Sequence, residues 1–242
     1  MPGAPSAAAY KRILLKVSGE GFARKGETAL DVDRVQRLAQ QLIALHREGI
    51  QVACVIGGGN ILRGAQAEDL GIDRATGDYM GMLATVINGL ALCDALERFG
   101  VPTRVMSALD VHKVCEPFIR RRALRHMEKG RVVVLVGGLG NPFFTTDTAA
   151  AQRAVELGCD ALIKATMVDG VYDKDPRKHK DAVRLPSLTF QEVLERRLKV
   201  MDQTAFALCQ EQNLPVVIFD MEAPDGLLRA ARGEKIGTIV RN

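Results

Sequence analysis

The segment Arg12–Gly21, with the sequence RILLKVSGEG, indicates the fold of this chain. Its first part is mainly aliphatic and lacks the polar alternation of a half-exposed strand, and it runs directly into a glycine-bearing turn. Such a run is typical of a strand that is buried on both faces of a sheet. The same arrangement recurs in VACVIGGGN, residues 52–60, and in VVVLVGGLGN, residues 132–141. Three such strands predict a parallel sheet with glycine-rich turns at the carboxyl ends of its strands.

Helical patterns separate the strand candidates along the chain. Val35, Leu38, Leu42 and Leu45 recur at steps of three and four residues after Asp31, whose side chain can cap the helix. The strand candidates are residues 12–17, 51–56, 103–106, 131–136, 161–164, 216–219 and 238–240. This alternation predicts an α/β fold, in which a central, mainly parallel sheet is covered on both faces in a three-layer αβα sandwich.

The length of 242 residues fits one large domain or two closely packed lobes. We expect residues 1–9, which are small and include proline, to form a disordered tail, and residues 10–242 to form a single domain. The only linker-like stretch is residues 173–186, which is polar and contains two prolines. The first residues have no apolar core of signal-peptide length, so we expect a cytoplasmic protein.

The composition disfavours several kinds of site. A formal net charge of +4 permits anionic ligands without requiring nucleic acid. No two cysteines have C-x-x-C spacing, and we expect all of them to be reduced core residues. The histidines likewise lack the spacing of metal ligands, so no zinc site is expected. These residues are Cys54, Cys93, Cys115, Cys159 and Cys209, and His46, His112, His126 and His179.

The segment Tyr79–Leu96 is apolar around most of a helical circumference, unlike a surface helix with one apolar stripe. A membrane span is an alternative interpretation, but Asn88, Asp94 and the marginal length disfavour it. We expect this helix to be buried partly by its own sheet and partly by a second subunit. The sequence therefore predicts a homo-oligomer.

The three glycine-rich turns are candidate phosphate sites, because glycine lets successive backbone N–H groups approach an oxyanion. Each turn could instead be only a tight connection between a strand and a helix. The Walker A pattern is absent, because neither residues 57–59 nor the turn at Gly137 has a lysine at the required position. The dinucleotide-binding fingerprint also fails, since Phe143 occupies the place of its third glycine.

A phosphotransferase without a Walker A loop needs other cations to oppose the repulsion between two anionic substrates. That repulsion is about 4 kcal/mol per pair of unit charges at about 4 Å and an effective dielectric constant of about 20. Lys16 and Lys164 lie at the ends of apolar strands. Burying a lysine at such a position costs free energy, so its presence there indicates a function. Alternatively, either side chain could extend so that its ammonium group reaches solvent. Asp147 follows two threonines at the mouth of the third turn, where it could serve the same centre or cap a helix.

Five motifs, in this order, carry a resemblance to a known family. They are KVSGE (residues 16–20), VIGGGN (55–60), GDYMGMLAT (77–85), GNPFFTTD (140–147) and KATMVDGVYDKDP (164–176). Together they resemble the bacterial UMP kinases of the amino-acid kinase fold family, from about residue 10 to the C-terminus. The resemblance implies transfer of the γ-phosphoryl group of ATP to UMP, giving UDP and ADP in pyrimidine nucleotide synthesis. It also implies an acceptor lobe over about residues 10–160 and an ATP lobe over about residues 161–242.

The resemblance implies roles for individual residues. Lys16 and Lys164 bracket the transferred group and Asp147 orients them, while Asp202 in the motif KVMD assists at the same centre. Further ATP contacts are implied for Ser18, Gly19, Gly59, Arg63, Thr166, Tyr172 and Asp175. UMP contacts are implied for Gly58, Asp78, Gly140, Asn141, Pro142, Phe143, Phe144, Thr145 and Thr146. Among these, Asp78 would accept hydrogen bonds from the ribose hydroxyls.

The implied mechanism is direct in-line transfer, with catalysis by positioning and charge stabilisation. Mg²⁺ is expected to arrive with ATP, and no residue is assigned to a metal site. A homohexamer, activation by GTP through residues 22–29, and inhibition by UTP are further implications. Two residues depart from the family pattern, because Leu139 stands where threonine is common and Met167 where lysine is frequent.

Two alternative functions remain open. An amino-acid or carbamate kinase of the same fold would share the lysines, but Asp78 and GNPFFTTD favour UMP. A nucleotide-sensing regulator that binds nucleic acid would use the basic run Arg120, Arg121, Arg122, Arg125, Lys129 and Arg131. No aromatic residues interleave with these charges, as they do in many nucleic-acid interfaces, so a solvated helix face is the competing interpretation.

Overall fold

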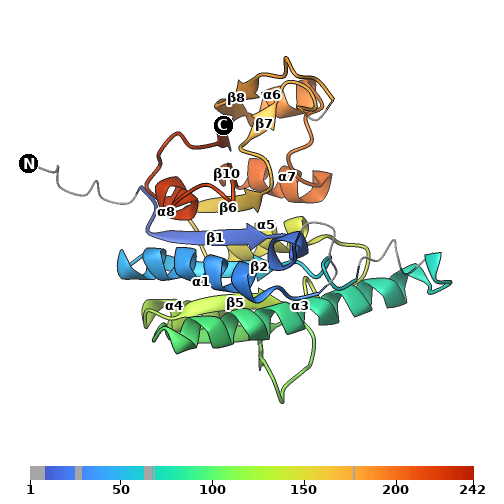
Figure 1. Ribbon diagram of the computed structural model, residues 1–242, viewed down its shortest axis with the longest axis vertical. Coiled ribbons are helices and arrows are strands. Elements are labelled where there is room, and N and C mark those ends of the chain that lie inside the picture. The colour runs from blue at the N-terminus through green and yellow to red at the C-terminus, as the bar shows by residue number, and fades with distance from the viewer. Residues whose placement is uncertain (1–8, 25–28, 63–66, 68, 177) are drawn as a thin grey trace, which may run out of the picture.

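A computed structural model describes residues 9–24, 29–62, 67, 69–176 and 178–242 of the chain (Figure 1). Most of the expected N-terminal tail and Arg63 therefore lie outside the described residues. Within these residues the strands form a nine-stranded sheet in the order β4-β3-β5-β2-β1-β6-β10-β11-β9, and β7 and β8 form a separate pair. Every neighbouring pair in the large sheet is parallel except β10 and β11.

The elements have the following bounds. The strands are β1 (Arg12–Val17), β2 (Gln51–Ile56), β3 (Thr103–Ser107), β4 (Glu116–Pro117), β5 (Val132–Val136), β6 (Ala161–Thr166), β7 (Val171–Tyr172), β8 (Arg184–Leu185), β9 (Ser187–Thr189), β10 (Val216–Asp220) and β11 (Thr238–Arg241). The helices are the 3-10 turn η1 (Gly19–Phe22), α1 (Val32–Arg47), α3 (Arg74–Arg98), α4 (Arg120–Glu128), α5 (Thr146–Glu156), α6 (Phe190–Glu195), α7 (Gln203–Glu211) and α8 (Gly226–Ala231).

The predicted fold class is confirmed, and each strand candidate matches an observed strand to within a residue or two at its ends. β4, β7, β8 and β9 were not predicted, because they are only two or three residues long and too short to show a hydrophobic period. The linker-like stretch, residues 173–186, contains the connection of the β7–β8 hairpin. Asp173 Oδ1 accepts a 2.8 Å hydrogen bond from the N–H of Val183, which closes that connection on itself.

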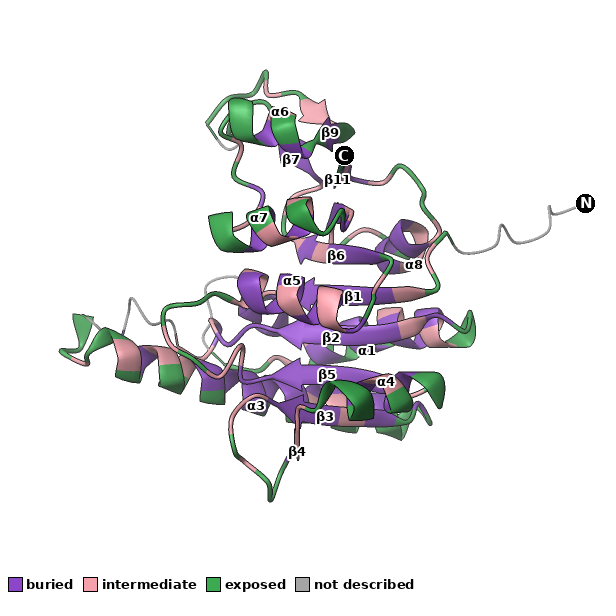
Figure 2. Cartoon of the chain, turned by 180° about the vertical axis from the view of Figure 1, so that it is seen from behind, coloured by how far each residue is buried: buried purple, intermediate pink, exposed green. Residues whose placement is uncertain are grey.

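Alternate residues of the central strands enter two separate cores, one on each face of the sheet. Leu15, Val17 and Ile56 face α1, α3 and α8, whereas Leu14 and Ala53 face α4, α5 and α7. Figure 2 shows the inner strands buried along most of their length between these helical layers. The expected sandwich follows directly from strands that are apolar on both faces.

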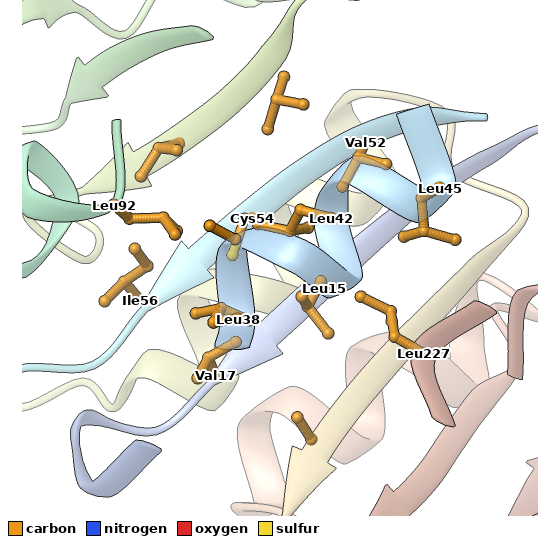
Figure 3. Packing of buried hydrophobic residues seen from close by; sticks show 14 of the residues in the cluster. Leu15, Val17, Leu38, Leu42, Leu45, Val52, Cys54, Ile56, Leu92 and Leu227 are labelled. Atoms are coloured by element: carbon orange, nitrogen blue, oxygen red, sulfur yellow. The ribbon is translucent and has the colours of Figure 1, made fainter. Parts of the chain in front are cut away.

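Helix α1 illustrates how the first layer is fixed. Asp31 Oδ1 caps it by accepting a 3.0 Å hydrogen bond from the N–H of Arg34, as the sequence predicted. The expected apolar positions Leu38, Leu42 and Leu45 point from the helix into the core formed with β1 and β2 (Figure 3). Each fully buried leucine stabilises the fold by about 1.5–3 kcal/mol relative to an exposed one.

Helix α3 runs along the same face of the sheet and extends beyond the carboxyl ends of the strands (Figures 1 and 2). Leu92 and Leu96 are fully buried against the sheet, which confirms that its own sheet covers part of the helix. By length and composition α3 could cross a membrane, but a single such helix is weak evidence, and this one packs on a core. The other side of the helix exposes a stripe of large apolar residues, namely Tyr79, Met80, Leu83, Ile87 and Leu90.

The basic run of α4 has acidic partners in the fold. Arg122 Nη1 lies 3.8 Å from Glu116, and Arg125 Nη1 lies 3.3 Å from Glu128. Phe118 beside this helix is covered by the guanidinium of Arg153, which lies 3.8 Å from the ring centroid. These contacts favour the interpretation of α4 as a solvated helix face.

Candidate active site

The carboxyl edge of the sheet brings the three glycine-rich turns together. β5, β2 and β1 are consecutive in the sheet and parallel, so the turns that follow them lie side by side. The first two turns are in contact through their backbones, because a Cβ on Gly19 would lie only 2.4 Å from the nitrogen of Gly59. Only glycine fits at position 19, and the backbones of the first and second turns therefore lie in contact.

The third turn continues into GNPFFTTD and bends back over α3. Gly140 has a φ of +79°, and a Cβ there would lie 2.9 Å from the carbonyl oxygen of Ala108. Phe143 is also left-handed, with a φ of +71° that is unusual for a bulky residue. Its N–H donates a 2.8 Å hydrogen bond to Asp78 Oδ2, while Asp78 Oδ1 accepts from Arg74 at 3.0 Å. Asp78 therefore ties the loop to the start of α3.

An ion cluster of two lysines and one aspartate lies next to these turns. Lys16 on β1 and Lys164 on β6 are register partners in the parallel pair, so both point to the α5 side of the sheet. Asp147, in the first turn of α5, has Oδ1 2.9 Å from Lys16 Nζ and Oδ2 2.7 Å from Lys164 Nζ. Lys164 Nζ also donates to the carbonyl of Val200 at 2.8 Å. All three charged side chains are at most 14% exposed.

Burial and the neighbouring charges act in opposite directions on the pKa values of Asp147 and Lys164. Burial alone would raise the pKa of Asp147, but the ammonium groups of Lys16 and Lys164 outweigh it and hold that pKa below its usual value. Burial lowers the pKa of Lys164, and the charge of Lys16 adds to this, although Asp147 opposes both. One carboxylate is shared between two ammonium groups, so the cluster keeps a net positive charge. Such a site attracts an anion with several oxygens.

Asp202 lies one contact away from the cluster and supports α5. Its Oδ1 caps α7 by accepting a 2.8 Å hydrogen bond from the N–H of Ala205. Its Oδ2 accepts from the hydroxyls of Thr145 and Thr148 at the start of α5. Thr145 in turn caps α5 through the N–H groups of Asp147 and Thr148. Asp202 therefore fixes the helix that carries Asp147.

Two cavities of about 550 Å³ each open on either side of the cluster. The first cavity is bounded by the turns and by α3. It is lined by Ser18, Gly19, Glu20, Gly57, Gly58, Gly59, Leu62, Asp78, Gly81, Met82, Thr85, Gly138, Leu139, Asn141, Phe144, Thr145 and Thr146. Of the predicted UMP contacts, Gly140, Pro142 and Phe143 belong to the same loop but do not line this cavity.

The second cavity lies between the ends of β6 and β10 and the β7–β8 hairpin. Lys164 lines it together with the predicted residues Thr166, Tyr172 and Asp175. Residues 196–199 also form part of its wall, and they were not among the predicted site residues. Their only signal was the basic sequence RRLK, whose last residue is the first of KVMD, and this sequence by itself is typical of an exposed turn. Among the described residues, no group of three or more His, Cys, Asp or Glu side chains could hold a metal ion.

The comparisons with known proteins agree with this geometry. The Amino acid kinase family matches residues 11–220. A uridylate kinase of Xanthomonas oryzae pv. oryzae is 57% identical over 96% of this chain and 97% of its own length. A uridylate kinase of Paramagnetospirillum magneticum is 55% identical over 98% of this chain and 99% of its own length. The crystal structure of a UMP kinase from Bacillus anthracis superimposes with a TM-score of 0.92 at 39% identity, covering 96% of each chain. The chain therefore belongs to the amino acid kinase family.

Proposed function

We propose that this protein is a UMP kinase, which transfers the γ-phosphoryl group of ATP to UMP and releases UDP and ADP. One observation carries the proposal. Asp78, residues of the three glycine-rich turns and half of GNPFFTTD, which are far apart in the sequence, line one cavity in a chain that is 57% identical to a uridylate kinase. An amino-acid or carbamate kinase would not need this combination of residues on its acceptor side.

The two cavities suggest where each substrate binds. UMP occupies the first cavity, where Asp78 accepts hydrogen bonds from the ribose hydroxyls and the loop of residues 140–146 contacts the uracil through the members that line the cavity, Asn141, Phe144, Thr145 and Thr146. The nucleoside of ATP occupies the second cavity, where Tyr172 supplies an aromatic ring beside Thr166 and Asp175. The ATP phosphates then extend from Lys164 toward Ser18 and Gly19.

The chemistry proposed for this arrangement is in-line transfer between the two cavities. The phosphoryl group passes beside Lys16 and Lys164, whose charges offset the repulsion between the substrates and stabilise the charge on the transferred oxygens. The amide groups of the glycine turns orient the phosphates. The phosphate of UMP is already an anionic nucleophile, so no residue is assigned as a general base.

Mg²⁺ is part of the proposal as a component of the bound ATP. The cluster consists of two ammonium groups and one carboxylate that both of them engage, and the nearby Asp202 accepts hydrogen bonds from Thr145, Thr148 and Ala205, so these side chains are not a ligand set for this ion. Mg²⁺ commonly retains waters and takes phosphate oxygens as ligands, so it fits here without a protein cage. When bound, it neutralises part of the phosphate charge.

The function is tested by ADP release with a panel of acceptors. Purified protein with ATP and Mg²⁺ is offered UMP, CMP, dUMP, AMP, aspartate, glutamate and carbamate. We expect UMP to have the highest kcat/KM. If any other acceptor clearly exceeds UMP, the assignment of the first cavity is wrong.

Replacing Asp78 by asparagine is expected to raise KM for UMP by about 10- to 100-fold. Hydrogen bonds to a charged partner contribute about 1.5–3 kcal/mol, and about 1.4 kcal/mol corresponds to a tenfold change in affinity. Steady-state kinetics should show little change in KM for ATP. The control is Asp73→Ala, which removes the cap of α3 at a residue that does not line the cavity. An unchanged KM for UMP in Asp78→Asn would contradict the proposed ribose contact.

Self-association through α3 belongs to the same proposal. The exposed side of α3 carries a contiguous stripe of large apolar side chains, and such patches usually mark an interaction surface. A second copy of the chain would cover this stripe. Ile87→Glu, at a position 49% exposed, is therefore expected to convert the assembly into smaller species, as measured by light scattering. Leu194→Glu, at a similarly exposed position on α6, is the control and should leave the mass unchanged. A wild-type monomer at micromolar concentration would refute this part of the proposal.

The homohexamer and the regulation by GTP and UTP rest on the resemblance alone, and the cytoplasmic location stays an expectation from the sequence. Residues 25–28 of the loop expected to respond to GTP lie outside the described residues. Initial rates with and without each nucleotide test the regulation directly: GTP should increase the rate and UTP should decrease it.

A further inference from the structure

Asn88 is a polar side chain at the buried centre of the apolar helix α3, and it has no exposed surface. Its Nδ2 donates to the carbonyl of Gly57 at 2.8 Å and to Asn60 Oδ1 at 2.7 Å. Its Oδ1 accepts from Asn60 Nδ2 at 3.2 Å. A buried amide is tolerated only when its hydrogen bonds are made, and here every one of them goes to the second glycine turn or to its asparagine.

The contact with Gly57 fixes the direction of the next N–H group. In a trans peptide the C=O and the following N–H point in opposite directions. Because Asn88 holds the carbonyl of Gly57 toward the core, the N–H of Gly58 points away from the core, and Gly58 lines the first cavity. Among the described residues, no group accepts a hydrogen bond from the N–H of Gly58 or Gly59. These two donors are thus available to an anion.

Thr85, one helical turn before Asn88, anchors the third glycine turn through a side-chain hydrogen bond of its own. Its Oγ1 accepts a 2.7 Å hydrogen bond from the N–H of Gly137 and donates to the carbonyl of Met82 at 2.6 Å. Thr85 is 3% exposed. Asp78 lies two turns earlier on the helix and binds the N–H of Phe143. One side of α3 therefore holds the second glycine turn, the third glycine turn and the loop that follows the third turn.

We propose that Asn88 and Thr85 are positioning residues for the acceptor phosphate. Asn88 acts through the peptide plane between Gly57 and Gly58, and Thr85 acts through Gly137. This inference rests on the proposed function, because it takes the first cavity as the UMP site. It assigns to the buried side of α3 a part in substrate binding that is separate from its packing on the sheet.

The test compares a ligand that carries a phosphate with one that does not. In Asn88→Leu, which is similar in volume and removes the donors, we expect the Kd for UMP to rise about tenfold or more, since small displacements of aligned groups are costly. Competition titrations should show the Kd for uridine within a factor of two of the wild type. KM for ATP should likewise be unchanged.

A matched core substitution separates positioning from stability. Leu92→Ala truncates a fully buried residue one turn further along α3, which belongs to the core cluster on this face of the sheet. It should lower the thermal midpoint at least as much as Asn88→Leu and leave the ratio of the UMP and uridine Kd values unchanged. If Asn88→Leu weakens UMP and uridine equally, or changes only the thermal midpoint, Asn88 is a core residue and the inference is wrong.

Thr85→Val keeps the inference testable if Asn88→Leu does not fold. Valine has nearly the same shape but cannot accept the N–H of Gly137, and the same selective loss of UMP affinity is expected. If Thr85→Val binds UMP and uridine with the same Kd values as the wild type, the inference is wrong. Failure of the wild type itself to bind UMP would refute the proposed function instead, so the two failures are distinguishable.

Discussion

Lys164→Met is expected to lower kcat by about 100- to 1,000-fold and to leave KM for UMP within a few-fold of the wild type. The Nζ of Lys164 lies between Asp147 and the second cavity, where it can meet the charge that develops during transfer. Losing one preorganised donor to such charge commonly costs about 100- to 1,000-fold in kcat. Methionine occupies a similar volume, so the strand should retain its packing. A coupled assay of ADP release measures both constants.

A second variant and a control make this expectation specific. Lys16→Met, on the other side of Asp147, should give a loss of the same order, because the two lysines share one carboxylate. Lys129→Met changes an exposed lysine at the end of α4 and should have no effect on kcat. Circular dichroism checks that the folds are equivalent. A normal kcat with a raised KM in Lys164→Met would mean that Lys164 binds substrate and transition state equally well.

Much of the catalytic cluster could be predicted from local sequence because its members conflict with their surroundings. Lys16 and Lys164 are charged residues at the ends of apolar strands, and such a conflict indicates a function or a partner. Their relation to each other could not be predicted from the pattern. It depends on β1 and β6 being neighbours in the sheet, although most of the acceptor half of the chain separates them.

The residues that support the site were harder to predict. Asn88 is a polar residue in an apolar helix, and in the sequence alone it indicates only that the helix is unsuited to a membrane. Its partners Asn60 and Gly57 are 28 and 31 residues away in the sequence, and a helical period contains no information about such contacts. Asp202 is similar, because its contacts with Thr145 and Thr148 arise from the packing of α5 on α7.

Leu139, where the chain departs from the family pattern, lines the first cavity and packs against the core behind it. Its carbonyl accepts a weak 3.4 Å hydrogen bond from Asn141. A leucine side chain can offer uracil only apolar contact, so any polar contact with the base at this position comes from the backbone. The departure is compatible with the cavity because the leucine side chain packs against the core behind the cavity wall.

Asp147→Asn is expected to lower the free energy of unfolding by about 3 kcal/mol and kcat by at least about 100-fold. Removing one partner of a buried ion pair leaves an uncompensated charge, which costs about 3–5 kcal/mol. Here two ammonium groups lose the same carboxylate, and both are largely buried. Denaturant unfolding at neutral pH measures the stability. Asp181→Asn, which changes an exposed partner of Lys174, is the control and should change stability by less than about 0.5 kcal/mol.

The pH dependence identifies the cause of this loss. Burial and the charge of Lys16 already lower the pKa of Lys164, and removing Asp147 should lower that pKa further. A lysine whose pKa is lower in the folded state destabilises the fold while it is charged, so the unfolding free energy rises as the pH increases through that folded-state pKa. The difference between variant and wild type should therefore shrink from pH 7 to about pH 10. Addition of ATP at pH 7 should also stabilise Asp147→Asn more than it stabilises the wild type, because its phosphates replace the missing negative charge. A loss that neither high pH nor ATP reduces would show that Asp147 acts through packing or helix geometry and does not balance the two lysines.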